Sequence, residues 1–427
     1  MKVLELFSGY GSQSLALKRL GIDHKSDISE IDKYAIDVYN QIHGKTHNWG
    51  DITKIDEKEL PYYDLITYSF PCQDISNAGK RRGLSKDSGT RSSLLWECER
   101  IIESVKPKYL LMENVKPLVG DVNLPNFSIW LKTLEDMGYR NYWQVLNAKD
   151  YGIPQNRERV FCVSILKELN TSYGFPKPIK LNKTLKYLLE DDVAESYYLK
   201  QEQVDAFMNS NSCSKEHSNT LCARDSYVVE AYKKFIDRND YIPEMFNTCN
   251  CAEIKGVAPA QTTNCGSTGT SSTVLIQVGN LKQSDSFGGN PQTGRIYSGE
   301  GLAPCLNTMQ GGGLEPKIVI GSTQKNTYIG NGTESPCLTA GMGQGGGNIP
   351  MVGFNNYKAR IRKLTPRECW RLMGVYDSDF DKIKGVSNSQ LYKMAGNSIV
   401  VDVLVEIFRN LLIDKVQAEQ VSLFDIL

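Results

Sequence analysis

A cysteine preceded by a proline is the residue of this chain best suited to nucleophilic chemistry. Cys72 follows Pro71, just after an apolar run at 63–68 that predicts a buried strand. Open α/β sheets carry their chemistry at the carboxyl ends of their strands, so this thiol is well placed to attack a substrate. The plain alternative is a buried structural thiol, the commonest role of a free cysteine. Activation would need nearby positive charge or backbone amides.

Three further polar side chains are expected at the same edge of the sheet. Glu113 follows a predicted strand at 109–112, where a carboxyl group could hold or transfer a proton. Arg157 and Arg159 precede a predicted strand at 160–165 and would share one face of an extended segment. The plain alternatives are a surface acid and an exposed charged turn.

A glycine pair near the N-terminus has the spacing of a cofactor turn. Residues 7–11 read Phe-Ser-Gly-Tyr-Gly in the first predicted strand-to-helix turn, where Gly9 and Gly11 let the backbone approach a ligand. Glu30, about twenty residues later, ends the second predicted strand, where an acid can accept from ribose hydroxyls. Asp51 follows what should be a third strand and could bind an adenine amine. The order favours an adenosine-containing cofactor over a plain turn and two surface acids.

Alternating strand and helix patterns position these residues. Between residue 1 and about residue 166 they predict a doubly wound α/β domain with a mainly parallel sheet. The predicted strands are 3–7, a segment near 27, 64–69, 109–112 and 160–165, and the predicted helices are 13–20, 33–42 and 94–105.

The middle of the chain has a different composition and an imperfect repeat. Residues 205–355 are rich in Gly, Ser, Thr and Asn. The segment 304–320, with Pro-Cys-Leu, a Gly-rich loop and an apolar run, resembles the segment 336–352, and weaker copies start near 259 and 219. Each unit predicts two short strands joined by a Gly-rich loop. For the strands, a plain scaffold of repeated β-hairpins is favoured. For the loops, binding a ligand and merely connecting the strands are left as equal alternatives.

Helical patterns return near residue 360. Thr365 is predicted to cap a helix that runs through Met373, with Glu368 at the capping-box position. A last helix at about 399–412 is expected to pack onto the first domain. The predicted domains are a catalytic domain at 1–185, a domain that contains the repeats and a hinge at 186–375, and a C-terminal segment at 376–427 that returns to the catalytic domain.

Composition limits the class of protein. The chain has 427 residues with 49 basic and 49 acidic side chains, which argues against a wholly basic DNA-binding surface but allows local patches near 80–91 and 358–367. The absence of a run of about 18 apolar residues makes a membrane span unexpected, and the N-terminus does not read as a signal peptide. The 11 scattered cysteines predict reduced thiols in a cytosolic protein, and Cys249 and Cys251 lack the second ligand pair of a zinc site.

Taken in order, these motifs resemble those of the DNA (cytosine-5) methyltransferases. The matching segments are Phe-x-Gly-x-Gly at 7–11, Glu30, Asp51, Phe-Pro-Cys-Gln at 70–73, Glu-Asn-Val at 113–115, Gln-x-Arg-x-Arg at 155–159, Arg-Lys-Leu-Thr-Pro-Arg-Glu at 362–368 and Gly-Asn-Ser at 396–398. The unmatched interval, about 170–355, falls where that family carries its variable target-recognition domain, which the resemblance therefore assigns to 186–375 with its hinge. One recognition domain built by duplication is favoured over separable units with different target sequences. One departure is the aliphatic Ile31, where relatives often have an aromatic residue.

The resemblance implies an S-adenosylmethionine-dependent, Rossmann-like fold with a smaller β-rich recognition domain. It implies methyl transfer to C5 of a flipped-out cytosine in a specific double-stranded DNA sequence, with Cys72 adding to C6. Glu113 would bind N3 and the exocyclic amine, Arg159 would hold O2, and Arg157 would help to orient the pocket. The stretch 77–93 would form a lid. The implied cofactor residues are Phe7, Ser8, Gly9, Gly11, Glu30, Ile31, Asp51, Ile52, Pro71, Asn397 and Ser398.

The resemblance also implies a bacterial or phage enzyme of a restriction-modification system or an orphan enzyme. We expect a monomer in the bacterial cytoplasm or nucleoid, with a cognate endonuclease as an open question. A tRNA-cytosine methyltransferase is disfavoured by the long insert and the lack of Cys-Phe-Thr. An inactive DNA-binding regulator is disfavoured by the intact Cys72, Glu113 and Arg159, and an amino-methylating enzyme by the lack of an Asp/Asn-Pro-Pro-aromatic motif.

Overall fold

The structure, a computed structural model, describes the predicted catalytic region almost completely and the middle of the chain only in short segments. The described residues are 1–71, 94–200, 202, 275, 277–280, 295–298, 301–306, 315–320 and 360–413. Cys72, the stretch 77–93, the pair Cys249 and Cys251, and the repeat copies other than 304–320 lie outside the described residues.

The chain forms two compact units. The first contains residues 1–182, 305–308 and 369–427, and the second contains 183–304 and 309–368. The first unit therefore includes a short piece of the predicted recognition domain and all of the C-terminal segment. The domain boundaries placed after residues 185 and 375 from the sequence remain predictions.

A six-stranded sheet forms the centre of the first unit, in the order β2-β1-β3-β4-β6-β5. β1, β2, β3 and β4 pair in parallel, whereas β6 runs antiparallel to both β4 and β5. The mainly parallel sheet is thus confirmed. The chain leaves β1 toward β2 on one side and returns to β3 on the other, so the topological switch point lies at the carboxyl end of β1. The strands are β1 Lys2–Leu6, β2 Lys25–Ser29, β3 Leu65–Tyr68, β4 Tyr109–Val115, β5 Tyr139–Asn147 and β6 Glu158–Leu166.

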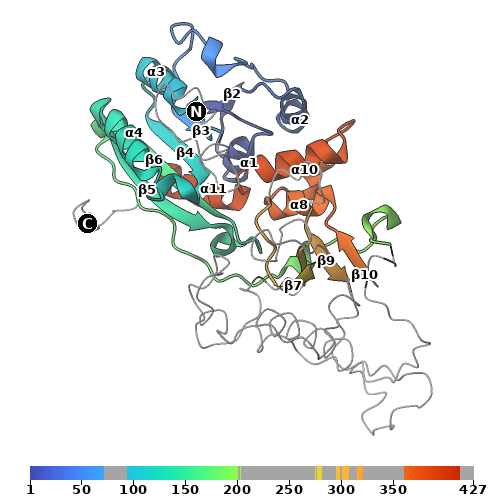
Figure 1. Cartoon of the computed structure of the whole chain (residues 1–427). Coiled ribbons are helices and arrows are strands. Elements are labelled where there is room, and N and C mark those ends of the chain that lie inside the picture. The colour runs from blue at the N-terminus through green and yellow to red at the C-terminus, as the bar shows by residue number, and fades with distance from the viewer. Residues whose placement is uncertain are drawn as a thin grey trace, which may run out of the picture. The chain divides into compact units, whose positions relative to one another are not determined.

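Helices cover both faces of this sheet (Figure 1). Alternate strand residues such as Leu6, Tyr68 and Met112 share one hydrophobic core with α3 and α4. Glu5 points to the other face, where its carboxylate meets α1 and α2, and α11 packs against α1. The helices of this unit are α1 Ser12–Arg19, α2 Lys33–His43, α3 Leu95–Val105, α4 Leu124–Asp136, α9 Asp377–Phe380, α10 Asn388–Asn397 and α11 Val401–Phe408, together with most of α8 Pro366–Leu372.

Several predicted elements differ from the structure. The strand expected before Asp51 is reduced to an isolated bridge between Ile28 and Asn48, and α4 and the edge strand β5 were not predicted. Gly396–Ser398 does not begin the last helix, because α10 ends at Asn397 and α11 starts only at Val401. Ser398 and Val400 are extended and separate α10 from α11, so the last helix begins a few residues later than the sequence suggested.

The second unit contains a four-stranded sheet in the order β10-β9-β8-β7. Its strands are β7 Gln277–Asn280, β8 Arg295–Ser298, β9 Lys317–Ile320 and β10 Arg360–Lys363. The apolar run predicted at 317–320 is confirmed as β9. β8 and β9 are parallel and the other pairs antiparallel, so this sheet is not a plain series of hairpins.

The capping box at the start of α8 is also confirmed. The Thr365 backbone N–H donates to Glu368 Oε2 at 2.8 Å, and the Glu368 N–H donates to Thr365 Oγ1 at 3.2 Å. Glu368 also accepts two bonds from Arg362, at 2.8 and 2.6 Å, and both side chains are almost fully buried.

None of the helices in the described part of the chain is long and apolar enough to cross a bilayer.

Candidate active site

Glu113 lies at the carboxyl end of the parallel strands, held from two sides. It occupies β4, two positions beyond Leu111, and only 5% of it is exposed. Arg159 Nε lies 3.2 Å from Glu113 Oε1, and the Ser69 hydroxyl donates to Glu113 Oε2. The buried carboxylate is therefore anchored through both of its oxygens.

Strand register brings these three side chains together. Tyr68 pairs with Met112, so Ser69, the next residue along, stands beside Glu113 and on the same face of the sheet. β6 is antiparallel to β4 and pairs Arg159 with Val115. The start of β6 therefore lies at the same edge as the ends of β3 and β4. The convergence predicted for Glu113 and Arg159 is confirmed, while Cys72 lies outside the described residues.

Arg157 is buried and donates hydrogen bonds to three backbone carbonyls. Only 3% of it is exposed. Its Nη1 donates to the carbonyl of Leu306 at 2.8 Å, and its Nη2 donates to the carbonyls of Gly396 and Ser398 at 2.9 and 2.6 Å. The guanidinium thus fastens two distant segments of the first unit to the start of β6. Such contacts suit a residue that positions the pocket rather than one that binds the base.

Cys305 is a neighbour of both arginines that the sequence motifs did not single out. Its Sγ lies 3.4 Å from Arg157 Nη1 and 3.7 Å from Arg159 Nη2. Desolvation raises the pKa of the Cys305 thiol, but the charges of Arg159 and Arg157 outweigh it and hold that pKa below its ordinary value. The only sequence signal was the repeated Pro-Cys-Leu tripeptide, which gave no reason to place this copy beside Arg159.

The predicted cofactor turn is built on Gly9 and Glu30. The Gly9 N–H donates to Glu30 Oε2 at 2.9 Å, and Glu30 Oε1 accepts from the N–H groups of Ile31 and Asp32 at 2.8 and 2.9 Å. A carboxylate has about four acceptor positions, so one remains for a ribose hydroxyl. Gly9 has φ +57°, and a Cβ there would meet nothing within 4 Å.

Two observations test whether these residues fit an adenosine group. The Ile31 side chain is 74% exposed directly after Glu30, which leaves a free apolar surface for a planar base. Phe7 adopts φ +56°, a conformation uncommon for a non-glycine residue and often found where backbone is held for a ligand. The open space over Gly9, the apolar Ile31 and the acceptor Glu30 fit S-adenosylmethionine.

A packed layer lies beneath the turn. Gly11 has φ +82°, and a Cβ there would lie 2.5 Å from Tyr39 Cε2 and 2.6 Å from His43 Nε2. His43 Nε2 donates to the carbonyl of Tyr10 at 3.0 Å, and the Tyr39 hydroxyl donates to Glu5 at 2.8 Å. Burial lowers the pKa of His43 to about 4, so the ring is neutral at physiological pH.

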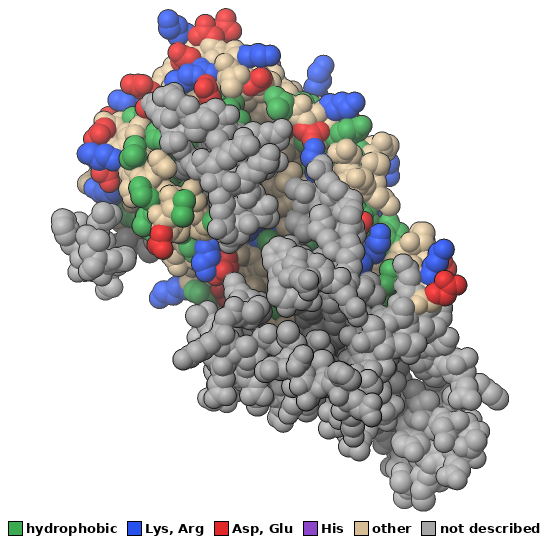
Figure 2. Space-filling view, viewed as in Figure 1, with side chains coloured by type: hydrophobic (Ala, Val, Ile, Leu, Met, Phe, Trp, Pro, Cys, Tyr) green, Lys and Arg blue, Asp and Glu red, His purple; other side chains and the backbone are tan. Residues whose placement is uncertain are grey.

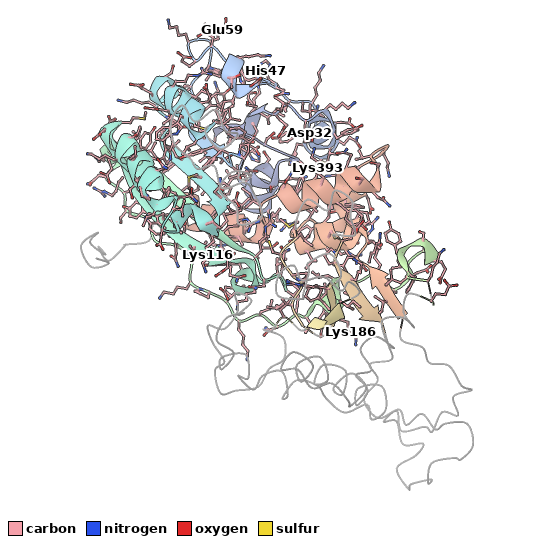
Figure 3. All side chains as sticks on the ribbon, viewed as in Figure 1. Asp32, His47, Glu59, Lys116, Lys186 and Lys393 are labelled. Atoms are coloured by element: carbon pink, nitrogen blue, oxygen red, sulfur yellow. The ribbon has the colours of Figure 1, made fainter. Side chains whose placement is uncertain are left out.

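The C-terminal segment closes the other side of the turn. Ser398 Oγ lies 2.6 Å from the Tyr10 hydroxyl and 3.2 Å from Ser12 Oγ, and the Tyr10 ring stacks on Trp370. Asp32, at the start of α2, and Lys393 of α10 face each other at 2.7 Å (Figure 3). Ser398 is thus confirmed beside the turn, and α10 is tied to the helix that follows Ile31.

The remaining predicted site residues lie at the edges of this region. Asp51 accepts from the Thr53 N–H and hydroxyl and caps a short 3-10 turn. Ile52 is buried, Asn397 is exposed, and Pro71 is the last described residue before Cys72.

On the visible face, Lys and Arg are interspersed with Asp and Glu over the described residues (Figure 2). That face therefore carries no continuous basic surface among the residues drawn in colour.

Comparison with known proteins gives one family over nearly the whole chain. The profile of the C-5 cytosine-specific DNA methylases matches residues 1–412. The chain is 34% identical to the Type II methyltransferase M2.ScrFI of Lactococcus lactis subsp. cremoris, over 96% of this chain and 99% of that protein. It is 33% identical to the Orphan methyltransferase M.SPBetaI of Bacillus phage SPbeta, over 96% and 97%.

A solved structure supports the fold. The Entamoeba histolytica methyltransferase EhMeth superposes with a TM-score of 0.58 at 15% identity, over 97% of this chain and 98% of that chain. The match extends over the doubly wound sheet as well as the segments that follow it. The chain belongs to the C-5 cytosine-specific DNA methylase family, whose members transfer a methyl group from S-adenosylmethionine to C5 of cytosine in DNA.

Proposed function

We propose that Cys72 is the nucleophile of this methyl transfer, with Glu113 and Arg159 as the residues that bind the cytosine. The observation that carries the proposal is the anchored carboxylate. Glu113 is held between Ser69 and Arg159 at the carboxyl edge of the sheet, and only Phe70 and Pro71 separate Ser69 from Cys72 in the sequence. This short connection, which Pro71 restricts, supports the assignment of Cys72 and Glu113 to one site.

The roles follow from the electronic structure of cytosine. C5 is too weak a nucleophile to take a methyl group directly, so the Cys72 thiolate first adds to C6 and places electron density at C5. Glu113 would hydrogen-bond N3 and the exocyclic amine, which stabilises the ring as its charge changes. When bound, S-adenosylmethionine supplies an electrophilic methyl group to C5. Loss of the C5 proton and release of Cys72 then restore the aromatic ring.

The two arginines have different parts in this proposal. Arg159 keeps Glu113 in place through Nε, and its Nη1 donates to the Glu158 carbonyl at 2.8 Å. Its guanidinium carries five N–H groups and can only donate, so it would hold the O2 acceptor of the base. Arg157 is buried under the pocket and holds the 396–398 segment by its carbonyls. We assign Arg157 to positioning rather than to contact with cytosine.

The cofactor would lie over the switch point of the sheet. Gly9 and Gly11 shape the turn, Glu30 accepts from the ribose, and Ile31 packs on the adenine. Asp51 and Ile52 would flank the base, and Ser398 would close the pocket with Asn397. The remaining contacts are assigned to the backbone of Phe7 and Ser8 and to Pro71.

The substrate would be a specific sequence in double-stranded DNA. C5 is inaccessible in a stacked duplex, so the target cytosine must leave the helix. We assign sequence recognition to the middle of the chain, 186–375, and closure of the pocket to residues 77–93. We further propose a monomer acting in the bacterial cytoplasm or nucleoid. Pairing with a cognate endonuclease would place the enzyme in a restriction-modification system.

A covalent trap tests the proposal. DNA carrying 5-fluorocytosine at methylated sites should form a stable adduct with the wild-type protein when S-adenosylmethionine is present. The sites are first mapped by bisulfite sequencing of DNA from cells that express the chain. Cys72→Ser should form no adduct, while Glu113→Gln should form it much more slowly. A wild-type protein that methylates DNA without forming the adduct would remove Cys72 from the mechanism.

A further inference from the structure

Ser69 and Arg159 both contact the Glu113 carboxyl group, and the Ser69 hydroxyl lies nearer to it than Arg159 Nε does. Ser69 directly follows β3 and is partly buried, and its hydroxyl donates to Glu113 Oε2. Arg159 occupies the other oxygen, Oε1. Each carboxyl oxygen therefore has its own donor, which restricts rotation of the carboxyl group.

Ser69 and Arg159 differ in what they can do when Glu113 changes its protonation state. Arg159 can only donate, so its bond weakens when the carboxyl group is neutral. A serine hydroxyl carries one donor proton and two acceptor lone pairs, and it rotates to suit its partner. Ser69 can donate to the ionised carboxylate and accept from the protonated carboxyl group. It is thus able to keep Glu113 oriented in both states.

Burial strengthens the effect of the hydrogen bond between Ser69 and Glu113 on the orientation of the carboxyl group. The Glu113 side chain is 6% exposed and that of Arg159 16% exposed, so water has little access to replace a lost donor. A buried carboxylate oxygen left without a partner carries the full penalty of its desolvation. Without the Ser69 hydroxyl, Glu113 could rotate about its last side-chain bond and would lose its fixed direction.

We propose that Ser69 is a positioning residue for the cytosine chemistry, acting on Glu113 through Oε2 while Arg159 acts through Oε1. The inference rests on the proposed role of Glu113 and goes beyond it. Positioning groups one step removed from the reacting atoms typically contribute tenfold to a hundredfold, by analogy with the outer ligands of metal sites. We expect an effect of about tenfold for Ser69.

The test compares Ser69→Ala and Ser69→Thr with the wild-type protein. Ser69→Ala should lower kcat about tenfold, while the KM values for S-adenosylmethionine and DNA stay within about twofold. Ser69→Thr keeps the hydroxyl and should recover most of the rate. Ser104→Ala is the matched control, because it removes an exposed hydroxyl that contacts only the Glu57 carbonyl among the described residues. Ser69→Gly serves as a second variant if the alanine protein unfolds at the assay temperature.

Two further readouts separate positioning from a structural effect. The exchange of the C5 hydrogen of cytosine in DNA without cofactor reports on the addition step, and Ser69→Ala should slow it in parallel with methylation. In a Glu113→Gln background, Ser69→Ala should lower kcat little further, because both substitutions act through the carboxyl group of residue 113. A further tenfold loss of kcat in that background overturns the inference. So does a Ser69→Ala protein with unchanged kcat, or one in which only the KM for S-adenosylmethionine changes. If Glu113→Gln is as active as the wild type, the proposed function fails first and Ser69 with it.

Discussion

Arg157 Nη2 donates to the carbonyl oxygen of Ser398 at 2.6 Å, which joins residues 241 positions apart in the sequence. Ser398 in turn meets the Tyr10 hydroxyl at 2.6 Å. A chain of contacts therefore runs from the segment beside Glu113, through the C-terminal backbone, to the cofactor turn. We therefore expect the proposed sites for the base and for the methyl donor to be linked through the buried Arg157 guanidinium.

Replacing Arg157 by lysine should uncouple these two sites. An ammonium group keeps the charge but cannot reach the carbonyls of Leu306, Gly396 and Ser398 together, because it lacks the planar fork of arginine. Each lost charge-assisted bond costs about 1.5–3 kcal/mol. We expect a clear fall in Tm and a higher dissociation constant for S-adenosylmethionine, measured by calorimetry.

The matched control for that variant is Arg140→Lys, which changes an exposed arginine on the edge strand β5. It should leave both Tm and cofactor affinity unchanged. If Arg157→Lys binds S-adenosylmethionine with wild-type affinity, the hydrogen bonds of Arg157 do not support the cofactor turn.

The two glycines of the cofactor turn should respond differently to alanine. Both have positive φ, which costs a non-glycine residue roughly 1–2 kcal/mol. At Gly11 the added Cβ also meets the rings of Tyr39 and His43, so Gly11→Ala should unfold at a much lower temperature. At Gly9 the methyl group enters open space, so Gly9→Ala should stay folded and lose affinity for S-adenosylmethionine instead.

Thermal unfolding and cofactor titration of the two proteins check this difference. Equal losses of Tm would mean that the space over Gly9 is not reserved for a ligand. A normal Tm for Gly11→Ala would contradict the close packing of Tyr39 and His43 beneath the turn.

Local patterns allowed the parallel part of the fold to be predicted, because apolar runs and helix caps are short-range signals. The position of Glu30 after β2 and the capping box of Thr365 and Glu368 were accessible in this way. Glu113 was placed near the correct end of its strand, although β4 continues through it to Val115. The contacts of Arg157 with Cys305, Gly396 and Ser398 were not, because they depend on where distant segments return. The start of the last helix was placed too early, because the apolar run at 399–412 has a helical pattern throughout, whereas Ser398 and Val400 are extended and α11 begins at Val401.

His43 should make stability depend on pH in a narrow range. Burial lowers its pKa from 6.5 to about 4, so the unfolded chain binds a proton at a pH where the folded protein does not. Stability from this residue is complete above pH 6.5 and is lost as the pH falls toward 4. A change of that size corresponds to roughly 3 kcal/mol.

Glutamine in place of His43 tests the pH effect and the contact with Tyr10 separately. Its amide N–H can still donate to the Tyr10 carbonyl, but it does not titrate. Denaturant unfolding at pH 7 should give similar free energies for wild type and His43→Gln, whereas at pH 4.5 the variant should be the more stable protein. Other titrating groups, such as Glu5 and Asp32, are present in both proteins and cancel in the difference. An identical pH dependence for both proteins would mean that His43 is not held neutral beneath the cofactor turn.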